Sequence, residues 1–144
     1  FTPVSTAPLH QLAISSVAIG TAHSAMVTDS NQCYMLGSNQ FGQLGCDTET
    51  NSPRTPCSPE FPADIRITAV ACGDMFTVAL SSDGQVFSWG KSARGRLGRT
   101  DDRASLPQRV DLNEEDSYSI TSLSCNHGNT LLVLKPYANQ SESP

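Results

Sequence analysis

The sequence predicts an all-β fold, a partial β-propeller made of tandem units, and three observations predict it. Short β-branched apolar runs such as residues 65–70 recur along the 144 residues, and no segment shows a convincing 3.6-residue helical period. The chain also repeats itself at a spacing of about 53 residues. A unit of this size cannot bury both faces of its small sheet alone, so neighbouring units must stack on it. Radial stacking of such units gives a propeller.

The repeat holds its register without a gap. A shift of 53 positions places Ile14 on Ile67, and a second shift places Ile67 on Ile120. The first shift also superimposes a later set of residues: Gly37, Gly42, Leu44 and Gly45 fall on Gly90, Gly95, Leu97 and Gly98. We therefore expect a lead-in at 1–13, repeat 1 at 14–66, repeat 2 at 67–119, the start of repeat 3 or ring-closing strands at 120–134, and a mobile tail at 135–144.

Each of the first two copies predicts a β-hairpin with a tight turn. The turns are 29–31 and 82–84, and Asn31 can adopt the positive φ that Gly84 supplies in the second copy. The predicted strands are 17–28 and 32–36 in the first copy, and 69–81 and 85–89 in the second. The proline- and charge-rich stretches that follow, 47–62 and 99–116, are predicted as loops or outer-strand connections.

Charge and composition narrow the function classes. Fourteen acidic and nine basic residues give a net charge of −5, which argues against direct nucleic-acid binding through phosphates. We find no basic and apolar leader and no long apolar run, so neither a signal peptide nor a membrane partner is expected. We expect a soluble protein of the cytoplasm or nucleus. Because the sequence starts with Phe1, we also expect it to be part of a longer protein.

The five cysteines are odd in number and include no C-x-x-C pair. This pattern fits neither a zinc site nor a disulfide framework, so free thiols are expected. Cys72 and Cys125 share one repeat position with Ile19, which indicates a small buried apolar slot and not a reactive thiol. His10 and His127 have no acidic or thiol partner at metal-ligand spacing. Neither a metal nor a cofactor is expected.

No motif supports catalysis, and the chain is not expected to be an enzyme. Residues 90–92 resemble the end of a phosphate-binding loop, but the required first glycine is replaced by Gln85. His23 and Ser24 are adjacent on a predicted strand and point to opposite faces, so they cannot act as base and nucleophile. We expect them to pack and to bridge blades. Trp89, at a strand end, is expected in the core, with a stacking platform as the alternative.

Two predicted loops hold candidate partner sites. Five basic residues lie close together in one loop, where they can engage an acidic protein surface or phosphate: Lys91, Arg94, Arg96, Arg99 and Arg103. Asp101 and Asp102 lie among them, so a solvated loop is the alternative. Three residues that precede prolines in the other loop are candidate phosphorylation sites, with turn formation as the alternative: Ser52, Thr55 and Ser58.

The second copy carries a family pattern. Residues 70–90 read V-A-C-G-x3-T-x-A-L-x2-D-G-x-V-F-x-W-G, and 95–98 read G-R-L-G. This pattern resembles the regulator-of-chromosome-condensation repeat, and the resemblance covers about residues 14–133. His23 with Ser24 fits the usual His-Thr of that family, whereas Leu36, Phe76 and Asn129 depart from it. The resemblance implies a seven-bladed ring, of which about two and a half blades are present.

A narrower resemblance is to the last propeller blades of never-in-mitosis-A-related kinases. It rests on Phe76, the run 95–97, the segment 123–125 and Thr130. It implies a non-catalytic protein-interaction or regulatory module that regulates an attached protein kinase or recruits its partners. The founding member of the repeat family implies the alternative, a guanine-nucleotide exchange factor for a small GTPase, and the arginine cluster alone would support a chromatin-binding module. Open blades of an incomplete ring also predict self-association.

Overall fold

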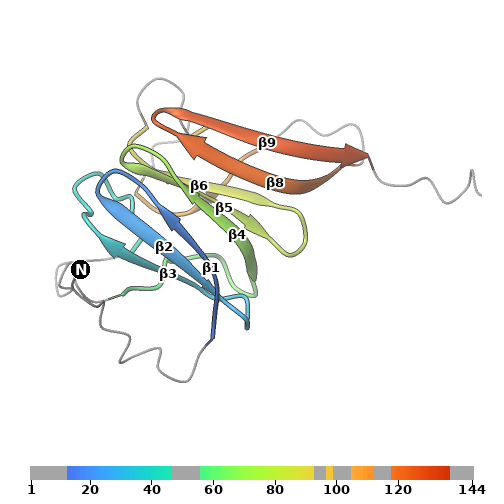
Figure 1. Cartoon of the computed structure of the whole chain (residues 1–144), viewed down its shortest axis with the longest axis horizontal. Helices are drawn as coiled ribbons and strands as arrows, with labels where there is room; N and C mark the ends of the chain where they lie inside the picture. Colours follow the sequence, from blue (N-terminus) through green and yellow to red (C-terminus); the bar gives the residue numbers. More distant parts are fainter. Residues whose placement is uncertain (1–12, 47–55, 93–96, 99–104, 112–117, 137–144) are drawn as a thin grey trace, which may run out of the picture.

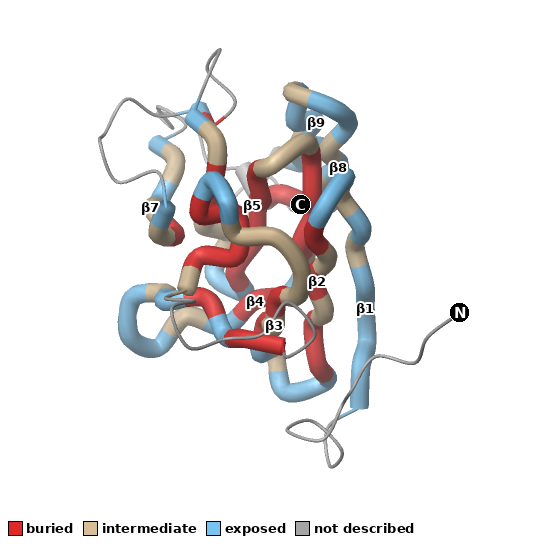
Figure 2. The backbone as a smooth tube through the Cα atoms, turned by 90° about the vertical axis from the view of Figure 1, so that its left-hand side faces the viewer, coloured by how far each residue is buried: buried red, intermediate tan, exposed pale blue. Residues whose placement is uncertain are grey.

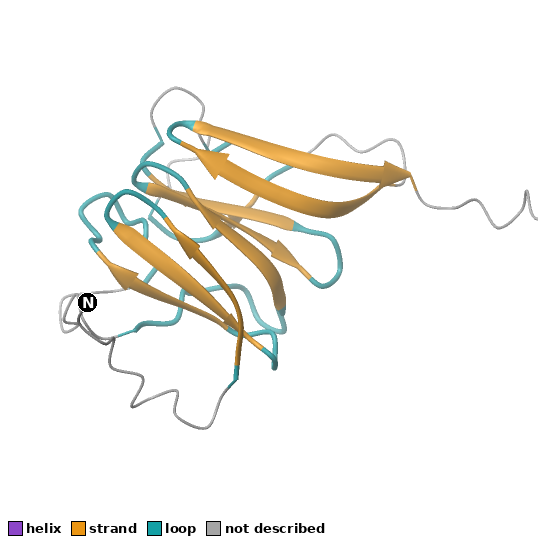
Figure 3. Ribbon diagram, viewed as in Figure 1, coloured by secondary structure: helices purple, strands orange, loops and turns teal. Residues whose placement is uncertain are grey.

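The computed structural model describes residues 13–46, 56–92, 97–98, 105–111 and 118–136. The regular secondary structure within these ranges consists of β-strands, which form three antiparallel sheets (Figures 1 and 3). The sheets stack face to face in sequence order, and we call them blades 1, 2 and 3. The all-β class and the stacking of successive units agree with the sequence prediction. None of the described residues belongs to a helix long and apolar enough to cross a bilayer.

Blades 1 and 2 are meanders of consecutive strands, and blade 3 is a single hairpin. Blade 1 contains β1 (Ile14–Ile19), β2 (His23–Thr28) and β3 (Cys33–Gly37). Blade 2 contains β4 (Ile67–Cys72), β5 (Phe76–Ser81), β6 (Val86–Gly90) and the short β7 (Gln108–Arg109). Blade 3 contains β8 (Tyr118–Asn126) and β9 (Asn129–Pro136), so β9 extends two residues into the segment expected as a tail.

The prediction of one long strand before each hairpin turn is wrong. Each of those segments folds into two antiparallel strands, β1 with β2 and β4 with β5. In blade 2 the reversal uses Met75, which has a left-handed φ of 58°, and the Gly73 N–H donates to the Phe76 carbonyl at 3.0 Å. The Gly73-Asp74 pair is a local signal for this turn, but the apolar residues on both sides of it suggest one continuous strand.

The two hairpin turns lie where the sequence predicts them. Asn31 has a φ of 63° and Gly84 a φ of 86°, so asparagine adopts the left-handed conformation at the position where blade 2 has glycine. In both turns a hydroxyl accepts the backbone N–H four residues later, at 3.2 Å for Thr28 and 2.9 Å for Ser81. The equivalent turns therefore share their geometry although their sequences differ.

The core lies between the blades, and every residue of β5 is buried (Figure 2). Successive side chains of a strand point to opposite faces. Ala79 belongs to the apolar cluster shared with blade 1, whereas Phe76, Val78 and Leu80 belong to the cluster shared with blade 3. Burial on both faces explains why β5 is almost continuously apolar and does not alternate with polar residues.

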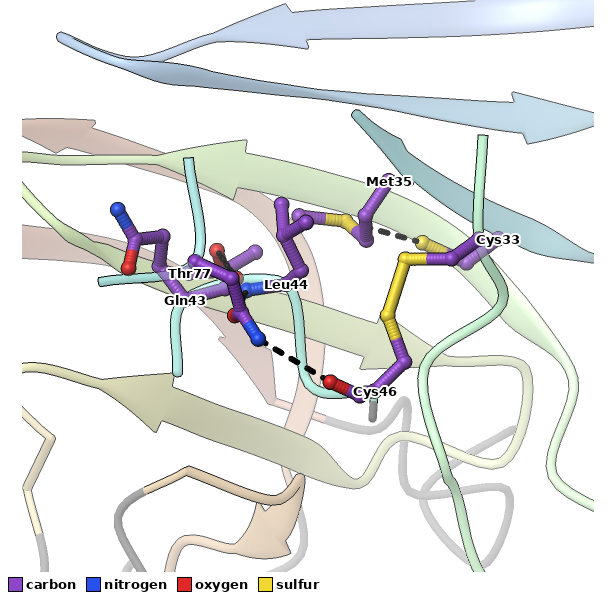
Figure 4. Close-up of a disulfide and its surroundings, with 8 residues drawn as sticks. Cys33, Met35, Gln43, Leu44, Cys46 and Thr77 are labelled. Carbon is purple, nitrogen blue, oxygen red and sulfur yellow. Dashed lines mark hydrogen bonds between the residues drawn. A yellow bond between two sulfur atoms is a disulfide. The ribbon is translucent and has the colours of Figure 1, made fainter. Parts of the chain in front are cut away.

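Cys46 and Cys57 form a disulfide, so the expectation that all five cysteines are free is wrong (Figure 4). The residues are 11 positions apart, and their Cα atoms lie 6.7 Å apart. Met35 brings Cys57 back to β3, because the two residues exchange backbone hydrogen bonds of 2.7 and 2.8 Å. Because the disulfide depends on the contact between Cys57 and β3, the spacing of the cysteines in the sequence does not predict it. Three cysteines remain free: Cys33, Cys72 and Cys125.

Candidate functional site

The structure describes two of the eight sequence-predicted site residues, Lys91 and Ser58. Ser58 is exposed and lies between the buried residues Cys57 and Pro59. The other predicted positions lie outside the described residues: Arg94, Arg96, Arg99, Arg103, Ser52 and Thr55. Lys91 directly follows β6 and therefore marks where the predicted basic loop begins.

Lys91 lies over the ring of Phe41, with Nζ 4.8 Å from the ring centroid. Phe41 belongs to the loop after β3 and Lys91 to the loop after β6, so the pair joins blades 1 and 2. Phe41 exposes 36% of its surface. An ammonium group over an aromatic face contributes about 0.5–1 kcal/mol at an exposed site. The pair presents an apolar ring and a positive charge at one position on the surface.

Gln43 supports this pair from beneath, and its side chain is fully buried. Its Oε1 accepts the Phe41 N–H at 2.9 Å, and its Nε2 contacts the Met75 sulfur at 3.4 Å. Its backbone carbonyl accepts the hydroxyl of Thr77 at 2.8 Å; both residues are labelled in Figure 4. Gln43 thereby ties the loop of blade 1 to a turn residue and a strand residue of blade 2 and holds Phe41 in place.

His23 makes a second buried link between blades 1 and 2. Its Nε2 lies 2.9 Å from Oγ1 of Thr77 and 3.1 Å from the carbonyl oxygen of Phe76. A carbonyl can only accept, so Nε2 carries the proton. Nδ1 has no hydrogen-bond partner among the described residues. Burial lowers the pKa of His23 below 6.5, and the hydrogen bond to Phe76 opposes this shift. The neutral imidazole bridges the blades, as the sequence predicts.

A row of polar residues crosses all three blades at the turns between their first and second strands. Thr21, Asp74 and His127 occupy the same repeat position. The Thr21 hydroxyl donates to one carboxylate oxygen of Asp74, and Nδ1 of His127 lies 3.4 Å from the other. The Asp74 N–H donates to the His127 carbonyl at 2.7 Å. The sequence search missed this row, although the 53-residue shift aligns its three members.

The polar row and the Phe41–Lys91 pair lie on the same edge of the blades. The Lys91 N–H donates to the Met75 carbonyl at 2.8 Å, and the Ser38 N–H donates to the Ala22 carbonyl at 2.8 Å. These bonds join the loops after the third strands to the turns that carry the polar row. We call this edge the loop face and define it by five residues: Thr21, Phe41, Asp74, Lys91 and His127.

The described thiols are unsuited to nucleophilic chemistry. Burial raises the pKa of Cys72 to about 12 and also raises the pKa values of Cys33 and Cys125. Thiols of this kind stay protonated at neutral pH. The predicted buried slot holds for Cys72, which is buried between blades 1 and 2, and in part for Cys125, which is partly buried against the cluster between blades 2 and 3. It is wrong for Ile19, which occupies the same repeat position in blade 1 and is 80% exposed. Within the described ranges, no group of three or more His, Cys, Asp or Glu residues is placed to hold a metal ion.

Trp89 is a core residue. It has no exposed surface, and its ring packs edge to face against Phe61, with centroids 5.4 Å apart. Phe61 makes the same kind of contact with Phe87 at 5.5 Å. A ring with no exposed surface cannot stack on a ligand, so the core interpretation is right and the stacking platform is wrong.

Three stacked antiparallel sheets joined through equivalent positions define a partial β-propeller made of tandem repeats. Two models of the regulator of chromosome condensation (RCC1) repeat match the chain, one at residues 30–80 and 83–133 and the other at 14–43 and 67–96. The chain therefore belongs to the RCC1 repeat family, and the resemblance seen in the sequence is confirmed.

Curated relatives and a solved structure agree with this assignment. The chain is 47% identical over 137 residues to the serine/threonine-protein kinase Nek8 of Danio rerio, which covers 95% of this chain and 19% of Nek8. It is 38% identical over 104 residues to the probable E3 ubiquitin-protein ligase HERC6 of Homo sapiens, which covers 71% of this chain and 10% of HERC6. Prp20p of Saccharomyces cerevisiae has the same fold, with a TM-score of 0.75 and 17% identity over 91% of this chain and 33% of Prp20p.

The chain thus spans a fifth or less of the length of these two curated relatives. The similarity to Nek8 confirms the resemblance to the propeller of a kinase of this group. Within that group, Phe76, the run 95–97, the segment 123–125 and Thr130 together resemble the ninth human type, which stays a prediction.

Proposed function

We propose that this chain is a non-catalytic protein-interaction module that regulates a protein kinase domain joined to it, and that the loop face makes the contact. The observation that carries the proposal is the placement of Lys91 over the half-exposed ring of Phe41, next to the row that contains Asp74. Exposed aromatic side chains on a rigid scaffold are typical of recognition surfaces. The 47% identity to Nek8 supports a kinase as the attached domain.

The chemistry of the described side chains supports a role without catalysis. His23 is buried and neutral, and its Nε2–H forms hydrogen bonds with Phe76 and Thr77 of blade 2. The free thiols are held protonated by burial. These groups serve the packing of the blades, which leaves recognition to the exposed loop face.

Two regulatory features belong to the same proposal. Four arginines would extend the positive charge that begins at Lys91: Arg94, Arg96, Arg99 and Arg103. Phosphate added to Ser52, Thr55 or Ser58 would bring negative charge to the loop after blade 1 and change docking to a charged partner. We also propose that this protein is cytoplasmic or nuclear. Its second repeat begins at residue 67.

The test measures binding between this chain and the separately produced kinase domain of Danio rerio Nek8, together with the phosphorylation rate of that domain. We expect Lys91→Glu and Phe41→Ala each to weaken binding about tenfold, because each removes one half of the exposed pair. Arg66→Glu is the control for charge reversal, since Arg66 is exposed and lies beside the hairpin turn of blade 1. Absence of both binding and a rate change contradicts kinase regulation, whereas sensitivity to Arg66→Glu alone contradicts the loop face.

A guanine-nucleotide exchange factor is the second candidate. The structural study of Prp20p, which shares the fold, covers its binding to Gsp1p and histones. The direct test follows release of labelled guanine nucleotide from Gsp1p in the presence of this chain. Accelerated release would favour exchange over kinase regulation. A parallel pull-down with purified histones at physiological salt tests the chromatin alternative, because low salt exaggerates binding between opposite charges.

A further inference from the structure

Ser58 is an exposed residue in a short segment that returns to β3, residues 56–61, which we call the Ser58 segment. Its neighbours Cys57 and Pro59 are both buried, so of these three residues Ser58 is open to solvent. Proline-directed protein kinases modify a serine that is followed directly by proline, and Ser58 is such a serine. The segment therefore combines an accessible phosphate acceptor with flanking residues that are held in the interior.

Backbone hydrogen bonds fix the Ser58 segment on both sides of the serine. Cys57 and Met35 exchange bonds of 2.8 and 2.7 Å, and the Glu60 N–H donates to the Gly45 carbonyl at 2.9 Å. A protein kinase binds its acceptor as an extended chain, so these bonds have to open before the serine can enter an active site. Phosphorylation of Ser58 therefore requires a local opening of the segment.

The disulfide joins the Ser58 segment to the loop that follows β3 (Figure 4). In this loop the Cys46 carbonyl accepts Nδ2–H of Asn39 at 3.1 Å, and Oδ1 of Asn39 accepts the Leu44 N–H at 2.9 Å. Gln43 binds the same loop to Thr77 of blade 2. While the disulfide exists, the segment cannot leave β3 without displacing this loop. The disulfide thus opposes the local opening that phosphorylation requires.

The disulfide can be opened by a thiol reductant such as glutathione. Cys46 is partly exposed, whereas Cys57 is 8% exposed, so the reductant meets Cys46 first. A glutathione thiolate attacks Sγ of Cys46, the S–S bond breaks, and Cys57 leaves as a thiolate that takes up a proton. A second glutathione thiolate attacks the glutathione sulfur of the mixed disulfide, and Cys46 leaves and is protonated to the thiol. The two electrons come from glutathione, which becomes its own disulfide.

We propose that the Cys46–Cys57 disulfide controls phosphorylation of Ser58: the oxidised chain is a poor kinase substrate, and the reduced chain is a good one. In the reaction Oγ of Ser58 takes the γ-phosphoryl group of ATP, loses its proton and releases ADP. The inference rests on the proposed function, in which phosphate on Ser58 changes docking. It also fits the proposed location, because disulfides in the cytoplasm or nucleus are usually transient and redox-sensing.

The test measures how fast a purified proline-directed protein kinase with ATP phosphorylates the 144-residue chain in reduced and in oxidised glutathione buffer. Phosphate on Ser58 is quantified by mass spectrometry, and Ser58→Ala identifies the signal. A synthetic peptide of residues 56–66 that carries Cys57→Ser corrects for any effect of the buffers on the kinase itself. Near-ultraviolet circular dichroism of the buried Trp89 shows whether the reduced chain stays folded.

Two cysteine variants complete the test. Cys46→Ser removes the bond and leaves the sequence around Ser58 unchanged, so it should be phosphorylated at the same rate in both buffers. Cys125→Ser keeps the bond and should behave as the wild type does. The reduced wild type should be phosphorylated about tenfold faster than the oxidised wild type, because loss of the bond makes the local opening easier.

Three results would overturn the proposal. The first is an equal rate for the oxidised and reduced wild type, and the second is phosphorylation only after the Trp89 signal is lost. The third is a slow reaction of Cys46→Ser in reducing buffer while the peptide reacts. Docking to a kinase domain does not enter this readout, so a failure of the proposed function would leave the result unchanged.

Discussion

His23 in blade 1 donates from Nε2 to Oγ1 of Thr77 in blade 2 across 2.9 Å, and both side chains are buried. Thr77 in turn donates its hydroxyl proton to the carbonyl of Gln43, which belongs to the loop after blade 1. Thr77 of blade 2 is therefore hydrogen-bonded to two residues that belong to blade 1 and its following loop, His23 and Gln43. Apolar contacts favour burial without direction, whereas these hydrogen bonds fix how the two sheets are placed relative to each other.

The pKa of His23 predicts a loss of stability in mild acid. Burial lowers the folded-state pKa below 6.5, so between 6.5 and that lowered value the unfolded chain binds a proton that the folded chain does not. The free energy of unfolding should fall as the pH drops through this window, by at most about 1.4 kcal/mol per pH unit, and should not change further through this residue at lower pH. Urea midpoints measured across the window test this.

His23→Phe is the matched variant for that measurement, because the same repeat position of blade 2 holds Phe76. The variant removes the titrating group, so its midpoint should vary less with pH than that of the wild type. Identical pH dependence of the two proteins would show that His23 is not the group responsible.

Comparison of Gly90 with Gly84 separates two costs of a substitution, the steric clash of an added side chain and the strain of a positive φ. Both have positive φ values, 114° and 86°. A Cβ added to Gly90 would lie 2.7 Å from Cα of Phe76, whereas one added to Gly84 would have no atom within 4 Å. Gly84→Ala should destabilise the fold by about 1–2 kcal/mol through conformation alone. Gly90→Ala should destabilise it by about 2 kcal/mol more.

Chemical denaturation of the two glycine variants, followed by circular dichroism, provides the comparison. Equal midpoints for the two variants would mean that the blade tolerates a side chain beside β5, against the close approach of β5 and β6 seen here.

The disulfide predicts three free thiols in the unreduced, denatured protein and five after reduction. The bond closes a short loop between Cys46 and Cys57, and a bond of this span stabilises a fold by about 2–3 kcal/mol. Reductant should therefore lower the urea midpoint of the wild type. The double variant Cys46→Ser, Cys57→Ser should show a lower midpoint that reductant does not change further.

Cys125→Ser is the control for the thiol experiment, because Cys125 has no disulfide partner. Its midpoint should still respond to reductant as that of the wild type does. Five reactive thiols in the denatured protein before reduction would rule out the disulfide.

The sequence predicts those features of the fold that the repeat encodes locally. Asn31 and Gly84 mark the hairpin turns, because few residues adopt a left-handed conformation without strain. The shared position of Cys72 and Cys125 marks a packing slot between blades, whereas Ile19 at the same repeat position of blade 1 is exposed. In a repeat protein, turn positions and some packing positions can therefore be predicted from the sequence alone.

Features that depend on chain segments meeting in space were missed. The Cys46–Cys57 bond requires the chain to return to Met35, and the polar row around Asp74 requires neighbouring blades to align their turns. The reversal near Met75 was missed because the apolar residues on both sides of the Gly73-Asp74 pair suggest one continuous strand. For the candidate site, the sequence identified Lys91 but not the ring of Phe41 beneath it.

The central claim is that adjacent repeats pack as blades through equivalent positions, and a double-mutant cycle between His23 and Thr77 tests it most directly. The free energy of unfolding is measured for the wild type, His23→Ala, Thr77→Val and the double variant. Residues in contact across the junction should show a coupling energy of about 1 kcal/mol. Effects that add to within about 0.3 kcal/mol would show that the two side chains do not interact, and would contradict the packing of blade 1 on blade 2.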